Sequence, residues 1–600
     1  MMSLSKALRT IISSTHSHHN KIRNFCSSVT ISKDTKQTSP DILLNKFKHA
    51  TSTSEVLDTF SQHKDVMNIK HIMQALRSVF VLQKEGRSDL STKSIISSRK
   101  FAQLCEKLKT LAGIIEPNET IEALKIVTYV GVPKNSTIVL VLLQLLRHNL
   151  NDLNLQQIIF LDFLLGNYSG VPLAEALKIA LPIVFDIQLP IKMERENIQS
   201  LKEYLHYASK HQLSNQSVDL ILSKTINCQE RYDAKTAKSI IWSICDMRPR
   251  PCFEKLLKKN VRVLTQVLDE LPFKDVDITL KKLMNSYTKY EYPYFRNEEF
   301  CNAVACLAMD KNLSLDQCIY IMKKLEQLDV INKPFIDFVF EKISEDLSKI
   351  DDLYYCYVIL KYMAKTDYRP ENWDEIIIKI KDSEKTKIDN IESRKLALAL
   401  CYHQIFDNKI IDEIFNNSLE KNLTNRDLIR QYLTVYYSLK LHRPELVPKN
   451  FKPENYLELI DTHKEFPLEG ALFSAFGGEK YVKTGVYSKE GIFIDHMIIF
   501  RKGGYPVSTN YTSKFIEDLD ISEDNEIVLV MCLHPEAYTK ENYLLKANSF
   551  RLELLEKLGY TVVPMCLESW NSLLDHEKIP YLVQNIKNKL QQDITLNTYG

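Results

Sequence analysis

The sequence predicts a mainly α-helical protein, an α-solenoid of degenerate helix-pair repeats followed by a small C-terminal α/β region. Glycine is rare, at 14 of 600 residues, and none lies between positions 171 and 469. Tight hairpins and phosphate-cradling loops need the positive φ angles that glycine supplies. The glycine-free stretch therefore excludes an ordinary β-sandwich, a Rossmann domain or a P-loop fold there, whereas helices joined by other turns can fill it.

Composition divides the chain into four segments. We expect a presequence at residues 1–25, a disordered linker at 26–40, a helical-repeat region at 41–460 and an α/β region at 470–595. The longest apolar run, residues 137–146, is far shorter than the roughly 20 residues of a membrane span, so no span is expected. Charge is balanced, with 78 basic and 76 acidic residues. Any nucleic-acid contact must therefore rest on local patches.

The first 33 residues have the composition of a mitochondrial targeting sequence, with five basic residues, eight serines and no acid. Leu4, Leu8 and Ile11 fall on one helical face. An acid-poor amphipathic start of this kind is typical of a matrix presequence. Arg23-Asn24-Phe25 looks like a matrix-protease site with the cut after Phe25. A basic tail without a targeting role is the alternative interpretation.

Apolar residues keep a helical spacing through most of residues 40–450. The pattern of residues 153–165 returns at 313–325, an offset of 160 residues that equals four units of about forty, as in two-helix repeats. Ser314 and Gln317 have the spacing of a capping box. Residues that cannot continue a helix stand between the expected units, namely Pro272, Pro293, Pro334 and Pro370.

A solenoid offers a long surface that suits an extended partner such as RNA or a peptide. The most basic stretch supplies candidate RNA contacts at Arg248, Arg250, Lys255, Lys258, Lys259 and Arg262. Aromatic residues follow at Tyr287, Tyr290, Tyr292, Tyr294 and Phe295. Basic groups for phosphates beside rings for bases would suit single-stranded RNA. A solvated helix face followed by a partly buried aromatic turn explains the same pattern.

After residue 470 the pattern predicts strands at 480–487, 492–500, 527–533 and 560–565. A helix is expected from Ala547 to Leu558, capped by Gly559, and a last helix at 579–590. The order β-β-β-α-β-α describes a small α/β domain.

The segment from Phe550 to Pro564, with Glu568-Ser569-Trp570 after it, resembles the RAP domain, which would span about 527–585. With Arg23–Phe25, the helical middle and Gly491–Asp495, the chain is similar to the FAST kinase domain-containing family of mitochondrial RAP-domain RNA regulators, nearest the fourth-member type. The resemblance implies a mitochondrial matrix protein that binds mitochondrial RNA and regulates the stability, processing or translation of transcripts. Other RNA-processing proteins would be further partners. No DNA partner and no cofactor are expected.

Enzyme activity is not expected. The sequence has no glycine-rich kinase loop, H-R-D or D-F-G motif, so kinase activity is excluded. The RAP region is similar to the PD-(D/E)xK nuclease fold, whose chemistry needs an Asp and then an acid-x-Lys on the next strand to hold a metal. Asp495 takes the first position as a vestigial candidate, while Val530 stands where the second acid is expected. We therefore expect no catalytic residue and no metal, and interpret Asp495 as a structural hydrogen-bond acceptor.

Two other functions remain open, a metal-dependent RNA-processing endonuclease and a mitochondrial protein-interaction scaffold. Within the RAP side, Lys480, Lys483, Lys546 and Arg551 are the residues expected to contact phosphate. Trp570 is expected in the core rather than on a stacking surface, because tryptophan is highly buried on average.

Overall fold

A computed structural model describes residues 41–193, 197–382, 390–417, 425–449, 451–457, 465–501, 503–508, 513–519, 522, 524–539 and 542–597. The predicted targeting sequence and linker at 1–40 lie outside these residues. The described residues fall into two compact units, one within Met1–Arg195 and Gln212–Ser217 and the other within Glu196–His211 and Val218–Gly600. The division falls inside the predicted helical region, and the C-terminal sheet belongs to the second unit with the helices that precede it.

The first unit consists of helices packed in two rows. One row is α2, α4, α7 and α9, and the other is α3, α6, α8 and α10, as their contacts show. Helix α5 packs against α6 and α7. The bounds are α2 (Ile42–His49), α3 (Thr53–His63), α4 (Ile69–Lys84), α5 (Thr92–Ser97), α6 (Arg99–Thr110), α7 (Pro117–Val130), α8 (Thr137–His148), α9 (Leu155–Leu165) and α10 (Pro172–Lys192).

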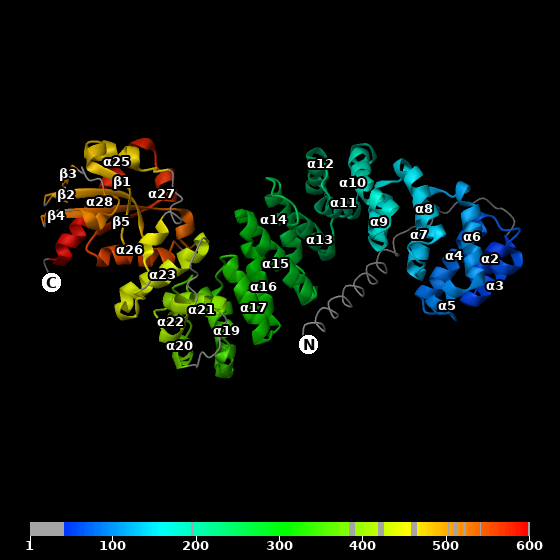
Figure 1. The fold of residues 1–600 in the computed structure, drawn as a ribbon, viewed down its shortest axis with the longest axis horizontal. Helices are drawn as coiled ribbons and strands as arrows, with labels where there is room; N and C mark the ends of the chain where they lie inside the picture. Colours follow the sequence, from blue (N-terminus) through cyan, green and yellow to red (C-terminus); the bar gives the residue numbers. More distant parts are fainter. Residues whose placement is uncertain are drawn as a thin grey trace. The chain divides into compact units, whose positions relative to one another are not determined.

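The second unit begins with the same kind of packing. Its first row runs α11, α13, α15, α17, α19, α21 and α23, each in contact with the next, while α14, α16 and α18 form the second row. Their bounds are α11 (Ile198–Lys210), α13 (Ala234–Cys245), α14 (Phe253–Thr265), α15 (Phe273–Tyr290), α16 (Glu298–Asp310), α17 (Leu315–Gln327), α18 (Lys333–Glu345), α19 (Leu353–Met363), α21 (Asn390–Tyr402) and α23 (Arg426–His442). Shorter or intervening helices are α12 (Asn215–Asn227), α20 (Trp373–Asp382) and α22 (Asn408–Asp412). Figure 1 shows these helices following one another along the chain.

Polar side chains that cap helices, rather than glycines, mark helix boundaries in the glycine-free region and at α9. Ser314 and Gln317 form the predicted capping box at α17, and Asn154 and Gln157 form one at α9, at the offset of 160 residues noted in the sequence. In each box the side chain of one residue accepts a hydrogen bond from the backbone N–H of the other, and the second side chain does the same in return. The predicted capping box at α17 is confirmed, and the repeated pattern forms the same cap at the start of both helices.

A mixed sheet completes the second unit (Figure 1). Its strands are β1 (Val482–Tyr487), β2 (Phe493–Arg501), β4 (Asn525–Leu533) and β5 (Thr561–Cys566), in the order β1-β2-β4-β5, with the short β3 (Tyr505–Val507) beside β2. The first three of these pair antiparallel, and β4 pairs parallel with β5. Helix α26 (Lys546–Lys557) connects the parallel pair, and Gly559 follows it at φ 95° as the predicted cap.

The expectation of a mainly helical chain with a small C-terminal α/β region is confirmed. The sequence did not reveal β3, α25 (Glu469–Phe476) or α27 (Leu567–Ser572), which are short; the last helix, α28 (Asp575–Asn597), is longer than expected. No helix in the described part of the chain is long and apolar enough to cross a bilayer.

The two faces of the sheet have different coverings. On one face, Ile498, Val530 and Met565 pack with Leu472 of α25 and Leu582 of α28 in one buried cluster. Trp570 belongs to this cluster and is buried, as predicted. Helix α26 packs on β5 and also against α23 of the helical region. This contact brings the helices and the sheet together around the residues discussed next.

Helix α23 contacts the turn between β1 and β2 through a hydrogen bond and an ion pair. The hydroxyl of Tyr437 donates to the carbonyl oxygen of Gly491 at 3.0 Å, and Lys440 pairs with Glu490 at 3.0 Å. Gly491 has φ 79°, and a Cβ there would lie 2.7 Å from Cβ of Pro453. Glycine is therefore required at this position both by its backbone conformation and by the close approach of the neighbouring chain.

Candidate nucleic-acid interface

Three of the predicted RNA contacts form a basic stripe on α14. Lys255, Lys258 and Arg262 are exposed and occur at helical positions i, i+3 and i+7. Residues at this spacing lie on one face of a helix. The opposite face holds Phe253, Leu256, Leu257, Val261 and Leu264, all buried. Because that apolar face is buried in the protein, the basic face of α14 points to solvent.

The other three predicted RNA contacts of the basic run differ in whether they contact other residues of the protein. Arg248 is exposed just before the helix, whereas Arg250 pairs with Asp219 at 2.5 Å. Lys259 donates to the carbonyl oxygen of Cys228 at 2.7 Å and lies 5.5 Å from the ring centre of Tyr232. Arg250 and Lys259 therefore have structural contacts inside the unit. The stripe of Lys255, Lys258 and Arg262 has no ion pair with a described residue.

Aromatic side chains lie next to α14. The short 3-10 helix η5 (Pro293–Phe295) packs against α14, and Phe295 is buried there. Tyr292 is 48 % exposed and stacks on Tyr294, with 5.3 Å between ring centres. The predicted aromatic turn is thus partly buried, and Tyr292 leaves part of its ring accessible beside a basic helix.

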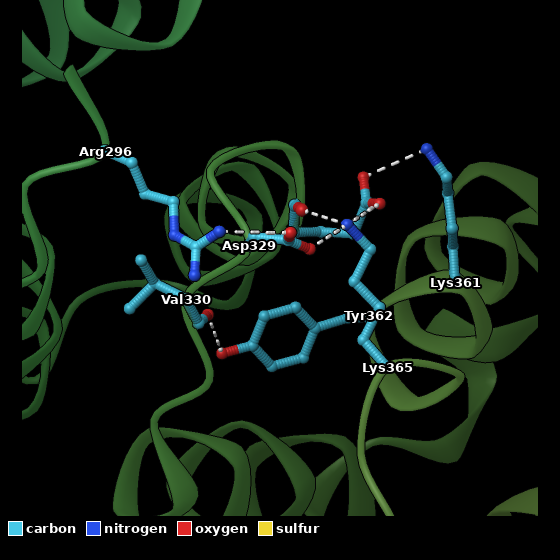
Figure 2. Close-up of polar contacts among 7 residues, drawn as sticks. Arg296, Asp329, Val330, Lys361, Tyr362 and Lys365 are labelled. Atoms are coloured by element: carbon cyan, nitrogen blue, oxygen red, sulfur yellow. Dashed lines mark hydrogen bonds and ion pairs between the residues drawn. The ribbon is translucent and has the colours of Figure 1, made fainter. Parts of the chain in front are cut away.

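Several basic residues in the first row of the second unit differ from the α14 stripe, because they form ion pairs with carboxylates of neighbouring helices. Figure 2 shows Lys361 of α19 and Lys365, just after α19, reaching the carboxylates at the end of α17, where Arg296 also contacts Asp329. Lys361 lies 3.0 Å from the buried Glu326, and Lys365 lies 2.6 Å from Asp329. Lys238–Asp275, Lys282–Asp246 and Lys324–Asp277 join other helices of that row in the same way. These lysines are thus neutralised by carboxylates of the protein, unlike the α14 stripe.

A cleft of about 610 Å³ lies where α23, α26 and the ends of β2 and β4 meet. Arg430 and Thr434 of α23 line one side, and Asn548 and Arg551 of α26 line another. The remaining lining includes Asp495 of β2 and the segment after β4, with Cys532, Leu533, His534, Glu536 and Ala537. The structure therefore brings the predicted Arg551 and Asp495 to one cleft.

Asp495 accepts a hydrogen bond from the backbone of the neighbouring strand. Its Oδ2 lies 2.7 Å from the amide nitrogen of Cys532, and the side chain is 4 % exposed. Burial, and then the charge of Asp495, raises the pKa of the Cys532 thiol, so that thiol stays protonated. The expected role of Asp495 as a hydrogen-bond acceptor for a strand is confirmed.

The position predicted for the second acid is wrong by one residue. Val530 pairs directly with His496, so both side chains lie on the face opposite Asp495. Met497 pairs with Leu529, which places Leu529, Met531 and Leu533 on the face of Asp495 instead. These three are apolar, so β4 supplies neither the acid nor the lysine of a nuclease site. Across the residues that the structure describes, no group of three or more His, Cys, Asp or Glu side chains could hold a metal ion.

The other RAP-side candidates lie apart from this cleft. Lys480 is exposed and sits 5.0 Å from the ring centre of Tyr481, and Lys483 is half-buried on the edge strand β1. Lys546, the first residue of α26, lines a second and smaller cavity. The four residues expected to contact phosphate are therefore divided among three places.

Sequence reasoning missed Arg430, Thr434 and Tyr437, which line the cleft from α23. Their spacing of four and three residues marks one helical face and could have been recognised. Their connection to Arg551 could not, because the two helices are more than a hundred residues apart.

Comparison with known proteins assigns no family, since no family model matches the chain and no curated protein matches it.

Proposed function

We propose that this protein binds single-stranded RNA and regulates mitochondrial transcripts without catalysis of its own. The observation that carries the proposal is the exposed stripe of Lys255, Lys258 and Arg262 on α14, the helix that contacts the aromatic turn with the accessible Tyr292. Lysine and arginine neutralise phosphates and release counterions, and an aromatic ring stacks on any base. This combination suits a flexible single strand better than a duplex, whose bases are already stacked.

The proposed architecture follows the sequence resemblance. The two rows of helices would be degenerate helix-pair repeats of an α-solenoid, and the sheet with its β4–α26–β5 crossover would be a nuclease-like RAP domain. The contacts between alternate helices and the parallel pairing of β4 with β5 support this interpretation. Stability, processing and translation of transcripts are all effects that a bound protein can exert.

The absence of catalysis is part of the proposal. Asp495 holds a strand amide, and the residues that share its face on β4 are apolar. A two-carboxylate metal site of the PD-(D/E)xK kind would need an acid at one of those positions. A matrix location is proposed from residues 1–25 of the sequence, and is tested by fusing residues 1–33 to a reporter and measuring import into isolated mitochondria.

RNA binding is tested on the full chain by fluorescence anisotropy with a labelled single-stranded RNA at several salt concentrations. Replacing Lys255, Lys258 and Arg262 by Ala removes three phosphate contacts, which makes the negative slope of log K against log salt shallower by about 2. The same change weakens binding roughly a hundredfold near 0.1 M salt.

A matched control replaces Lys46, Lys48 and Lys70, which are exposed lysines of the first unit, by Ala. It removes the same charge and should leave the slope unchanged. Equal effects of the two triple variants would show that net charge, rather than the stripe, binds RNA. No binding by the unmodified chain would contradict the proposal and favour a protein scaffold.

A further inference from the structure

A second cavity, of about 180 Å³, lies between the helical region and the start of α26. Its lining includes Arg369, Trp373, Tyr402, His403, Gln404 and Lys546. These residues come from the segment before α20, from α20 itself, from the end of α21 and from α26. The cavity is separate from the α14 stripe and from the cleft beside Asp495.

Among the residues that the structure describes, two cations and no carboxylate line this cavity. The guanidinium of Arg369 is held in place by donating to the carbonyl oxygens of Thr366 at 3.0 Å and Tyr368 at 2.8 Å. It also lies 4.7 Å from the ring centre of Trp373. Burial lowers the pKa of Arg369, and the charge of Asp367 opposes this shift. Arg369 is nevertheless exposed, and its guanidinium carries a positive charge at pH 7.

The rest of the lining is neutral at pH 7. His403 contacts the carbonyl oxygen of Leu360 through Nε2 at 2.7 Å, so this nitrogen carries the proton. Burial lowers the pKa of His403 to about 4, and the charges of Arg369 and Lys546 act in the same direction. Arg369 and Lys546 line the same cavity as this imidazole.

Gln404 follows α21 in the left-handed conformation that ends many helices, with φ 56°. The backbone N–H of the next residue, Ile405, donates to the carbonyl oxygen of Leu400 at 3.0 Å and closes this end. The side-chain amide of glutamine offers donors that suit an anion.

We propose that the cavity formed by Arg369, Trp373, His403 and Lys546 binds a phosphate group carried by the 5′ end of an RNA strand or by a free phosphate ester. Drug-sized ligands occupy roughly 300–1,000 Å³, so a cavity of about 180 Å³ admits a phosphate but not a whole nucleotide. Lys546 opens α26, and the positive end of a helix dipole favours an anion there. The RNA source rests on the proposed function, whereas phosphate binding itself does not.

The test uses the full chain and the fluorescence of Trp373, one of three tryptophans. Inorganic phosphate, uridine 5′-monophosphate and a ten-nucleotide oligouridylate with or without a 5′ phosphate are titrated in turn. A Trp373→Phe variant identifies the signal. We expect the 5′-phosphorylated strand to bind at least about fivefold tighter than the 5′-hydroxyl strand, since one phosphate contact contributes roughly that factor near 0.1 M salt.

Lys546→Ala and Arg369→Ala should each remove this preference. Lys587→Ala, an exposed lysine of α28, should keep it. If Arg369→Ala fails to fold, Lys546→Ala alone decides. A Lys546-dependent response to inorganic phosphate or the mononucleotide identifies a free ester as the source, and a response to the phosphorylated strand alone identifies RNA. No response to any phosphate probe, or a preference that survives Lys546→Ala, overturns the proposal. The triple α14 variant separates the two sites, because it should weaken both strands equally and keep their ratio.

Discussion

Replacing Asp495 distinguishes a structural acid from a catalytic one. Asp495→Ala would leave the buried N–H of Cys532 without the acceptor that lies 2.7 Å away. An unpaired buried donor costs about 1–3 kcal/mol, with the upper part of the range for a bond to a charged group. Asp495→Asn keeps a carbonyl oxygen at the same place and should lose less.

Hydrogen exchange at the amide of Cys532 reports this bond directly. Since about 1.4 kcal/mol corresponds to a tenfold change, we expect Asp495→Ala to accelerate exchange there by about 10- to 100-fold. Thermal unfolding should show a lower midpoint in the same order, with Ala below Asn. RNA affinity should not fall, because the change removes a negative charge from a cleft that also contains Arg430 and Arg551.

A nuclease would behave differently. The reasoning is refuted if the unmodified chain cleaves RNA with added Mg²⁺ or Mn²⁺ and Asp495→Asn abolishes cleavage while its unfolding midpoint and its exchange at Cys532 stay unchanged. Such a result would assign the carboxylate to the reaction rather than to the strand.

Two further predictions concern stability. Tyr362→Phe should lower the free energy of unfolding by about 1–3 kcal/mol, because the hydroxyl donates to the carbonyl oxygen of Val330 at 3.0 Å (Figure 2) and accepts from the amide of Asn332 at 3.1 Å. Tyr368→Phe is the control, because its hydroxyl donates to a carboxylate of Asp337. Equal losses in the two variants would contradict this account. Acid should destabilise the second unit, because burial lowers the pKa of His496 from 6.5 to about 4 in the folded state. The unfolded chain then binds the extra proton between these values, so stability is full above pH 6.5 and falls by up to about 1.4 kcal/mol per pH unit below it. Urea unfolding at pH 7 and pH 5 should show this loss, and His496→Gln should reduce it; an unchanged pH dependence in that variant would contradict the assignment.

The sequence could predict features that local pattern controls. The spacing of Ser314 and Gln317 predicted the start of α17. The two residues lie within one helical turn of each other, so no tertiary information was needed. The basic run at 248–262 was also visible in the sequence, but which of its residues share an exposed face came from the structure. Strands β1, β2, β4 and β5 were likewise found from short runs of β-branched and aromatic residues.

Features that depend on strand register or on contacts between distant residues could not be predicted from the sequence. Val530 was misplaced because a shift of one residue turns a side chain to the opposite face of a sheet, and only the pairing with His496 fixes that shift. The contacts of Arg250 with Asp219 and of Lys259 with the carbonyl of Cys228 join positions about thirty residues apart. The convergence of Arg369 and Lys546 spans more than 170 residues. Each required the packed structure.

The central claim is that this protein contacts RNA through α14 and its neighbouring aromatic turn. Ultraviolet crosslinking in intact mitochondria, followed by sequencing of the attached RNA and mapping of the crosslinked peptides, tests it most directly. We predict mitochondrial transcripts in the crosslinked fraction, and crosslinks in peptides that contain Lys255–Arg262 or Tyr292. Recovery of no mitochondrial transcript above background, or crosslinks confined to other helices, would contradict the claim.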